Sequence, residues 1–467
     1  MISKPESTPS LRWAAPLLRF LNAVRSGRVV VLSLLKVSAA VALCAAAIMI
    51  GSTAFAERAV GLWAAAGRVD ITPTGPAYIA GYGQNRRSLD AHDRLSARCL
   101  VLESRGVRLA IVSCDLIGLP RYEIEKIRAR IKSVPPDHVI VAATHTHSGP
   151  DTVGQWGPGI AVRGVDDAWL ASTLGKIAQL VDETSAQLRP ADIRFSSRSD
   201  ITGISKNIRV PRILDTELGV MQVRDIKDAK CIATLVNYAC HPEILNNRHM
   251  TADFPHWLYE TIEAKVGGTC IYVNGAQGGM ITADYDESTA PKGENWAAAE
   301  SLGRRLGQYA LESLDNAVLA QGPAITFQRS VFNVPLENKM FQTLIKLHVF
   351  QGGALKNGQV ETEVSRFTIG PAEFLTIPGE ALPNVGFYLK RHMHGQPKFL
   401  LGLTDDFLGY ILAPEDYGLR LYEYESGVSV GPAIEPQVTR HLLDLINDPG
   451  HRASDPQRRN FIRDARP

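Results

Sequence analysis

Apolar residues along this chain follow two alternating patterns, short continuous runs and longer segments with helical spacing. The short runs are rich in Val, Ile and Leu and predict buried strands. They cover 63–70, 98–103, 108–114, 138–143, 193–197, 218–223, 231–238, 269–273, 324–334, 366–370, 372–377 and 398–401. The longer segments carry an apolar stripe and predict helices at 122–132, 166–187, 255–265, 294–315, 383–392 and 436–447.

This alternation predicts an α/β fold in which layered, mixed β-sheets are flanked by helices. No Pro/Ser-rich linker divides residues 57–447, so we expect them to form a single domain. The polar segment 448–467 is predicted to be a disordered tail.

The first 56 residues differ in composition from the rest. Residues 1–28 are basic, an apolar stretch follows over 29–50, and the segment ends in Ala54-Phe55-Ala56. A positive region, an apolar region and an Ala-x-Ala site are typical of a secretory signal. We therefore predict that 1–56 is a signal peptide with a long basic region, cleaved after Ala56, and that the mature protein is periplasmic or secreted. An uncleaved membrane anchor is the alternative.

Charge and cysteine content exclude some classes of function. The 467 residues carry a formal net charge of +2, so no basic field for nucleic acid exists, and no nucleic-acid partner is expected. After the signal, five cysteines remain, and no Cys-x-x-Cys motif occurs. We therefore predict buried free thiols rather than a thiolate metal site, with a Cys231–Cys240 bridge as a less favoured possibility.

The strand at 138–143 runs directly into a polar motif, Thr144-His145-Thr146-His147-Ser148-Gly149-Pro150. Side chains alternate along a strand, so His145 and His147 are expected to project to the same side. Two imidazoles placed in this way can bind a divalent metal, or act as one ligand and one acid/base. Two hydrogen-bonded loop histidines are the alternative.

Other strands also end on residues of catalytic type. They are His241 with Glu243, Glu380 in a Gly/Pro-bounded turn, Tyr410 in an apolar run, and the Gly-rich loop 274–279. Binding sites commonly gather at strand ends. Each residue also has a structural interpretation: a core histidine, a carboxylate at a helix N-terminus, a packed tyrosine, and a tight turn with positive φ.

Taken together, these segments resemble the catalytic domain of the neutral ceramidases, which are zinc-dependent amidohydrolases. The resemblance runs from about Gly67 to Ser426 and is most specific at 144–150, with further matching segments at 67–72, 206–209, 240–242, 252–253, 379–380 and 409–417. It implies that zinc is held by His145, His241, Glu380 and Tyr410. It also implies that His147 acts as acid/base or hydrogen-bond donor, and that Arg209 polarises the substrate carbonyl.

Two departures from the family pattern concern the substrate. Gly279 stands where ceramidases carry a loop serine, and no counterpart of the family's C-terminal immunoglobulin-like domain follows residue 447. Both make ceramide itself a less secure substrate. The metal-hydrolase interpretation is less affected, because all four inferred ligands are present.

The sequence therefore predicts an exported zinc-dependent hydrolase that cleaves a linear amide, such as an N-acyl lipid or sphingolipid, by metal-activated water. Its partner would be a small-molecule or lipid substrate, with transient contact to a membrane surface; the oligomeric state is open. The alternatives are a metallo-esterase or lactonase on the same scaffold, and an inactive metal-containing ligand-binding protein.

Overall fold

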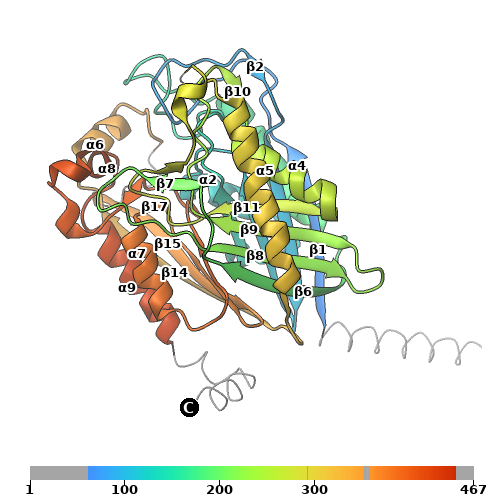
Figure 1. Ribbon diagram of the computed structural model, residues 1–467. Helices are drawn as coiled ribbons and strands as arrows, with labels where there is room; N and C mark the ends of the chain where they lie inside the picture. The colour runs from blue at the N-terminus through green and yellow to red at the C-terminus, as the bar shows by residue number, and fades with distance from the viewer. Residues whose placement is uncertain (1–60, 292, 352–354, 356, 449–467) are drawn as a thin grey trace, which may run out of the picture. The chain divides into compact units, whose positions relative to one another are not determined.

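The computed structural model describes residues 61–448 except 292, 352–354 and 356 (Figure 1). The predicted signal peptide at 1–56 lies outside the described residues, as does the predicted tail apart from Asp448. Among the residues described, no helix is both long and apolar enough to span a bilayer.

A mixed sheet of nine strands forms the larger half of the described domain. Its strands are β1 (Leu62–Asp70), β3 (Ser96–Ser104), β4 (Val107–Cys114), β5 (Val139–Ala143), β6 (Arg189–Arg198), β8 (Leu218–Asp225), β9 (Cys231–Tyr238), β11 (Thr269–Asn274) and β13 (Val318–Leu319). The strand order is β11-β9-β8-β6-β1-β3-β4-β5, with β13 paired to β6. The end pairs β11–β9 and β4–β5 are parallel, and the other pairs are antiparallel.

A second sheet of four strands packs face to face against the first. It contains β14 (Ile325–Pro335), β15 (Gln359–Ile369), β16 (Ala372–Thr376) and β18 (Lys398–Leu401). The core between the sheets joins residues such as Ile140 and Phe195 of the large sheet to a stack of Phe367, Phe374 and Phe399 in the small one. Alternate residues of each strand point into this core, as the pleat requires.

Helices cover the two outer faces, so the domain has four layers (Figure 1). The large sheet is covered by α2 (Arg121–Arg128), α3 (Asp167–Ser185), α4 (Phe254–Val266) and α5 (Trp296–Ser313). The small sheet is covered by α6 (Lys339–Lys346), α7 (Pro383–His392) and α9 (Ile434–Asn447). This arrangement confirms the predicted α/β fold with layered, mixed sheets flanked by helices.

Short strands and helical turns in the connecting segments complete the fold. The strands are β2 (Asp90–Ala91), β7 (Ser205–Asn207), β10 (His249–Met250), β12 (Ile281–Ala283), β17 (Glu380–Ala381) and β19 (Tyr410–Ile411). The helical turns are η1 (Pro136–His138), η2 (Glu287–Thr289), η3 (Leu314–Asn316), η4 (Pro414–Asp416), η5 (Arg420–Tyr422) and α8 (Glu423–Gly427).

The predicted elements match the observed ones, and the largest differences of length concern one helix and two strands. The predicted strand 193–197 is the middle of the longer β6 (Arg189–Arg198). The predicted helix 122–132 ends at Arg128, because the chain continues in i to i+3 turns after it. The predicted strand 366–370 covers only the end of the longer β15. The first half of β15 contains Glu361 and Glu363, so its sequence lacks the apolar run that predicts a buried strand. The five described cysteines are free, and four of them are buried, as predicted.

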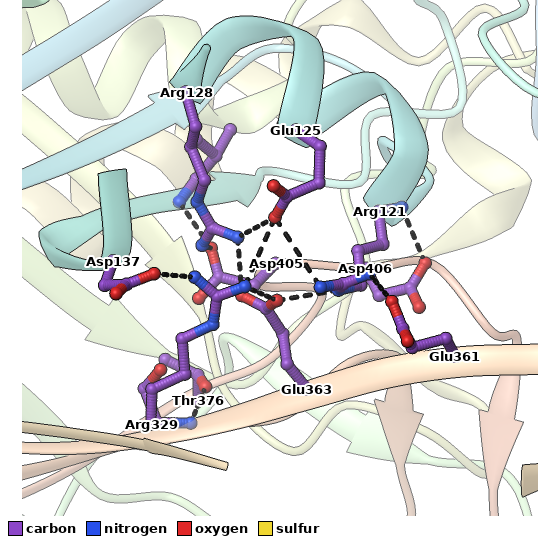
Figure 2. Close-up of polar contacts among 12 residues, drawn as sticks. Arg121, Glu125, Arg128, Asp137, Arg329, Glu361, Glu363, Thr376, Asp405 and Asp406 are labelled. Atoms are coloured by element: carbon purple, nitrogen blue, oxygen red, sulfur yellow. Dashed lines mark hydrogen bonds and ion pairs between the residues drawn. The ribbon is translucent and has the colours of Figure 1, made fainter. Parts of the chain in front are cut away.

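Buried ion pairs explain why charged residues occupy that first half of β15 (Figure 2). The fully buried Glu363 accepts hydrogen bonds from Arg121 Nε at 2.7 Å, Arg128 Nη1 at 2.6 Å and Arg329 Nη2 at 2.6 Å. Arg128 also contacts Asp405 at 3.0 Å. The network therefore joins α2 on the large sheet to β14 and β15 on the small one.

Candidate metal centre

His145 and His147 lie in a turn just after β5, rather than on the strand itself. The strand ends at Ala143, and His145 adopts a left-handed conformation with φ +70°. From the sequence, we expect the alternation of side chains along a strand to place both rings on one side. That reason is wrong, because neither histidine lies on the strand. The turn nevertheless brings the two imidazole centroids within 4.9 Å of each other. A non-glycine residue such as His145 keeps a left-handed backbone conformation only where the surrounding structure holds it there.

His241 follows β9 and faces His145, with ring centroids 5.0 Å apart. Each ring places one nitrogen against a backbone carbonyl: His145 Nδ1 lies 2.6 Å from the oxygen of Ile117, and His241 Nδ1 lies 2.7 Å from that of Ile281. A carbonyl only accepts hydrogen bonds, so both Nδ1 atoms carry the proton. In the neutral rings, both Nε2 atoms are therefore acceptors that point at the centre.

Glu380 supplies a third acceptor to the same centre. Its Oε2 atom lies 3.0 Å from His241 Nε2 and 3.4 Å from His145 Nε2. Burial opposes the charged carboxylate, but the two histidines hold the pKa of Glu380 well below its usual range. Burial also opposes a charged imidazole, yet Glu243 and Glu380 raise the pKa of His241 to about 9. The carboxylate of Glu380 therefore stabilises a positive charge at this centre, either a proton on His241 Nε2 or a cation in the place of that proton.

A divalent cation fits this centre by distance and by ligand type. Ligands about 2.1 Å from a tetrahedral zinc ion lie about 3.4 Å from one another, close to the observed separations. Imidazole nitrogen and carboxylate oxygen are both common zinc ligands. Backbone carbonyls that orient the rings from behind are typical of metal-ligating histidines.

His147 belongs to the same cluster but has a different environment. One nitrogen of each of His145, His147 and His241 lies within 4.8 Å of those of the other two, so these three buried rings could also hold a metal ion together. Among the described residues, neither ring nitrogen of His147 has a hydrogen-bond partner, and a carboxylate oxygen of Glu243 lies 3.6 Å from Nδ1. Burial and the neighbouring imidazoles hold the pKa of His147 well below its usual value. The ring is therefore neutral.

Two residues that the sequence analysis did not single out hold His147 in place. A Cβ atom on Gly81 would lie 2.4 Å from the His147 ring, so only glycine fits there, at φ +98°. Arg86 donates hydrogen bonds to the backbone oxygens of His147 and Ala80. Burial lowers the pKa of this guanidinium to about 10.

Asn274 ties the two histidine segments together. Its Nδ2 atom donates to the carbonyl oxygens of Thr144 at 3.2 Å and Cys240 at 2.9 Å, and its Oδ1 accepts from the Cys240 amide at 3.1 Å. From its sequence, the loop 274–279 is a candidate binding loop, with a tight turn as the alternative. The loop is a tight turn: Gly279 has φ +73°, and Gly278 donates to the Ala381 carbonyl beside Glu380.

Tyr410 and Arg209 occupy different positions relative to the centre. Tyr410 is buried on β19, in parallel register with Glu380 on β17. Burial and the charge of Glu380 raise the pKa of Tyr410 well above its usual value. Arg209 is engaged with the buried Glu425, at 2.7 Å from Nε and 3.1 Å from Nη2. The ligand role of Tyr410 and the catalytic role of Arg209 both stay predictions.

A cavity of about 410 Å³ opens beside the centre and is mostly apolar. His145, His147, Glu380 and Tyr410 line one part of it. Apolar side chains from other elements line the rest, among them Ile117, Leu336, Phe341, Phe407, Leu408 and Val430. Such a cavity can hold a long apolar group next to the polar centre.

The fold and the site therefore describe an α/β protein with a buried histidine–carboxylate centre in an apolar cavity. Part of the sequence is similar to a neutral ceramidase from Pseudomonas aeruginosa, with 27% identity over 182 residues. This match covers 35% of the chain and only 27% of that enzyme's length. No protein-family model matches the chain.

Two solved structures share the fold. The crystal structure of neutral ceramidase from Pseudomonas aeruginosa has a TM-score of 0.70 at 18% identity, over 84% of this chain and 75% of that one. A ceramidase complexed with C2 has a TM-score of 0.69 at 17% identity, over 84% and 76% of the two chains. These findings confirm that the chain has a neutral ceramidase-like fold, as the resemblance predicted.

Proposed function

We propose that this protein is a zinc-dependent amidohydrolase that cleaves an amide bond of an N-acyl lipid or a related apolar substrate. The observation that carries the proposal is the convergence of His145 Nε2, His241 Nε2 and Glu380 Oε2 on one buried point. The apolar cavity and the likeness to neutral ceramidases support an apolar amide as substrate.

In this proposal His145, His241, Glu380 and Tyr410 hold the zinc ion. Zinc, when bound, would supply a Lewis acid that polarises a carbonyl and lowers the pKa of water. The Ile117 and Ile281 carbonyls keep both ligand rings in the required tautomer. The apolar side chains of the cavity would surround the apolar part of the substrate in place of water.

His147 would move the proton in the reaction. Its ring is neutral and unpartnered, and it lies within hydrogen-bonding reach of a group bound at the centre. It would take a proton from the attacking water and deliver it to the leaving amine nitrogen. Arg209 would polarise the carbonyl, which requires that its guanidinium exchange part of its contact with Glu425.

The proposal also assigns the protein to the periplasm or the extracellular space, because residues 1–56 have the pattern of a cleavable signal. Expression of the whole chain in a bacterium, followed by cell fractionation and N-terminal sequencing, tests this part. We expect a released protein that begins at Glu57. A protein that begins at Met1 and stays with the membrane would contradict it.

A substrate panel with and without a chelator tests the reaction itself. The purified protein is given linear N-acyl amides, the matching esters and lactones. We expect amide hydrolysis that a zinc chelator abolishes and that added zinc restores. Hydrolysis of esters or lactones alone would identify a metallo-esterase. Zinc binding with no hydrolysis of any substrate would identify a ligand-binding protein.

A further inference from the structure

Apolar side chains that face solvent are concentrated on four segments around the cavity. Two of them also supply residues to its wall: Phe341 and Ile345 belong to α6, and Tyr424 belongs to segment 419–424. Segment 160–162 follows the wall residue Trp156 along the chain. The fourth is segment 208–213. We call the exposed apolar residues of these segments the apolar rim.

Direct contacts place the four segments next to one another. Ile160 lines a surface hollow together with Met340 and Leu347 at the two ends of α6. Asn338, the N-cap of α6, donates to the carbonyl of Gly427 in α8, and the two helices lie side by side in Figure 1. The ion pair between Arg209 and Glu425 joins segment 208–213 to the same helix.

The rim is unusually apolar for a surface in contact with water. Ile160, Val210 and Leu347 are 61%, 62% and 51% exposed. Contiguous exposed apolar surface of this kind marks a site of contact with another molecule.

The charges within the rim segments are predominantly positive. The exposed cations are Arg212, Lys339, Lys346 and Arg420, and Glu423 is the exposed carboxylate. The whole chain is almost neutral, with a net charge of +2, so this excess is local. Apolar side chains interspersed with cations are complementary to the surface of a membrane that contains anionic lipids.

We propose that the apolar rim docks the protein on an anionic lipid surface, so that the cavity receives its substrate directly from the membrane. The apolar side chains would enter the headgroup region while the four cations contact lipid phosphates. The identity of the substrate that enters the cavity rests on the proposed function. The docking itself does not depend on hydrolysis.

Vesicle co-sedimentation tests the docking. The protein is mixed with vesicles of phosphatidylcholine alone, or of phosphatidylcholine with phosphatidylglycerol, at low and high salt. We expect binding to the anionic vesicles that high salt weakens. The double variant Ile160→Asp/Leu347→Asp is expected to lower the partition constant at least about tenfold. Lys346→Glu should lower it at least about fivefold, because it replaces a cation by an anion.

Matched variants away from the cavity provide the control. Ile226 and Val318 are 61% and 71% exposed, and Lys227 is an exposed lysine in the turn after β8. The double variant Ile226→Asp/Val318→Asp and the variant Lys227→Glu should bind vesicles like the wild type. Hydrolysis of a short soluble amide serves as a separate readout and should be equal in the rim and control variants.

Three results would overturn the proposal. The wild-type protein could stay in the supernatant with both kinds of vesicle, or the rim and control variants could lose binding equally. Alternatively, light scattering could show a dimer in solution that only the rim double variant dissociates, which would make the rim an interface between two copies of the chain. Vesicle binding without amide hydrolysis would sustain the docking and contradict the proposed function.

Discussion

At the residue scale, the candidate centre depends on which atoms face it rather than on which residue types are present. His145 and His241 present Nε2 because their Nδ1 atoms are held by backbone carbonyls. Neither ring nitrogen of His147 has such a partner in the part of the chain that the structure describes. The same side chain therefore fits a ligand role at two positions and a proton-transfer role at the third.

Replacement of His147 separates these two roles. His147→Gln should lower the rate of amide hydrolysis by about a hundredfold or more, since general acid–base catalysis contributes on that order. The zinc content of His147→Gln should stay at the wild-type level. The control His394→Gln, at an exposed histidine that follows α7, should also keep the wild-type zinc content. Loss of zinc in His147→Gln would instead make His147 a metal ligand.

Gly81 provides a test of how closely the surroundings hold His147. A methyl group in Gly81→Ala would overlap the His147 ring and require a positive φ. We expect the ring to be displaced and kcat to fall at least about tenfold, since small shifts of a catalytic group are costly. Gly106→Ala, at a positive-φ glycine with open space around it, controls for backbone strain alone. Equal activity of both variants would contradict the predicted overlap.

At the element scale, the buried ion pairs around Glu363 connect helix α2 to strands β14 and β15 (Figure 2). Glu363→Gln would leave three guanidinium groups close together without the central charge, at a cost of about 3–5 kcal/mol in the free energy of unfolding. Glu361→Gln should cost less than about 1 kcal/mol, because the Glu361 side chain is 38% exposed and its ion pairing within the described part of the chain is limited to Arg121. Urea unfolding measures both, and equal losses would contradict a central role for Glu363.

The nearby carboxyl of Asp406 predicts a dependence of stability on pH. Burial raises the pKa of Asp406 to about 6. Between about pH 4 and pH 6 the folded state therefore keeps a proton that the unfolded state has lost, so this group lowers the free energy of unfolding as the pH rises. Above that range the full cost of about 3 kcal/mol applies.

Asp406→Asn removes that titration while it keeps an acceptor for the amides of Arg121 and Phe407. The free energy of unfolding of the variant minus that of the wild type should rise by about 3 kcal/mol from about pH 4 to about pH 7. Urea unfolding of both proteins across this range measures the difference. Parallel curves for the two proteins would contradict the raised pKa.

At the scale of the whole molecule, the fold could be predicted largely from hydrophobic periodicity. Strands such as β9 and helices such as α3 bury a continuous run or stripe, so their sequences carry the signal. The two-residue strands β17 and β19 could not be predicted in this way, because pairing with distant segments defines them. Helix α6 was missed because it is only eight residues long, although Phe341 and Leu344 give it a buried apolar face. The first half of β15 was missed because its charged residues are neutralised by α2 and β14, far away in the sequence.

For the candidate site, the sequence could predict which residues take part but not the contacts that hold them in place. His145, His241 and Glu380 were chosen from strand-end motifs and the resemblance, and the structure brings all three together. The supporting contacts of Asn274, Gly81 and Arg86 depend on long-range packing, which no local pattern reveals. Arg209 shows the limit of motif reasoning, because Glu425 engages it across more than two hundred residues of sequence.

The measurement that tests the central claim most directly is the metal content of the purified protein by mass spectrometry. The wild type is compared with His241→Ala and with His249→Ala, a control at a histidine on the short strand β10. We predict about one zinc ion per chain in the wild type and the control, and none in His241→Ala. A wild-type protein without stoichiometric metal after exposure to zinc, or full occupancy in His241→Ala, would contradict the account.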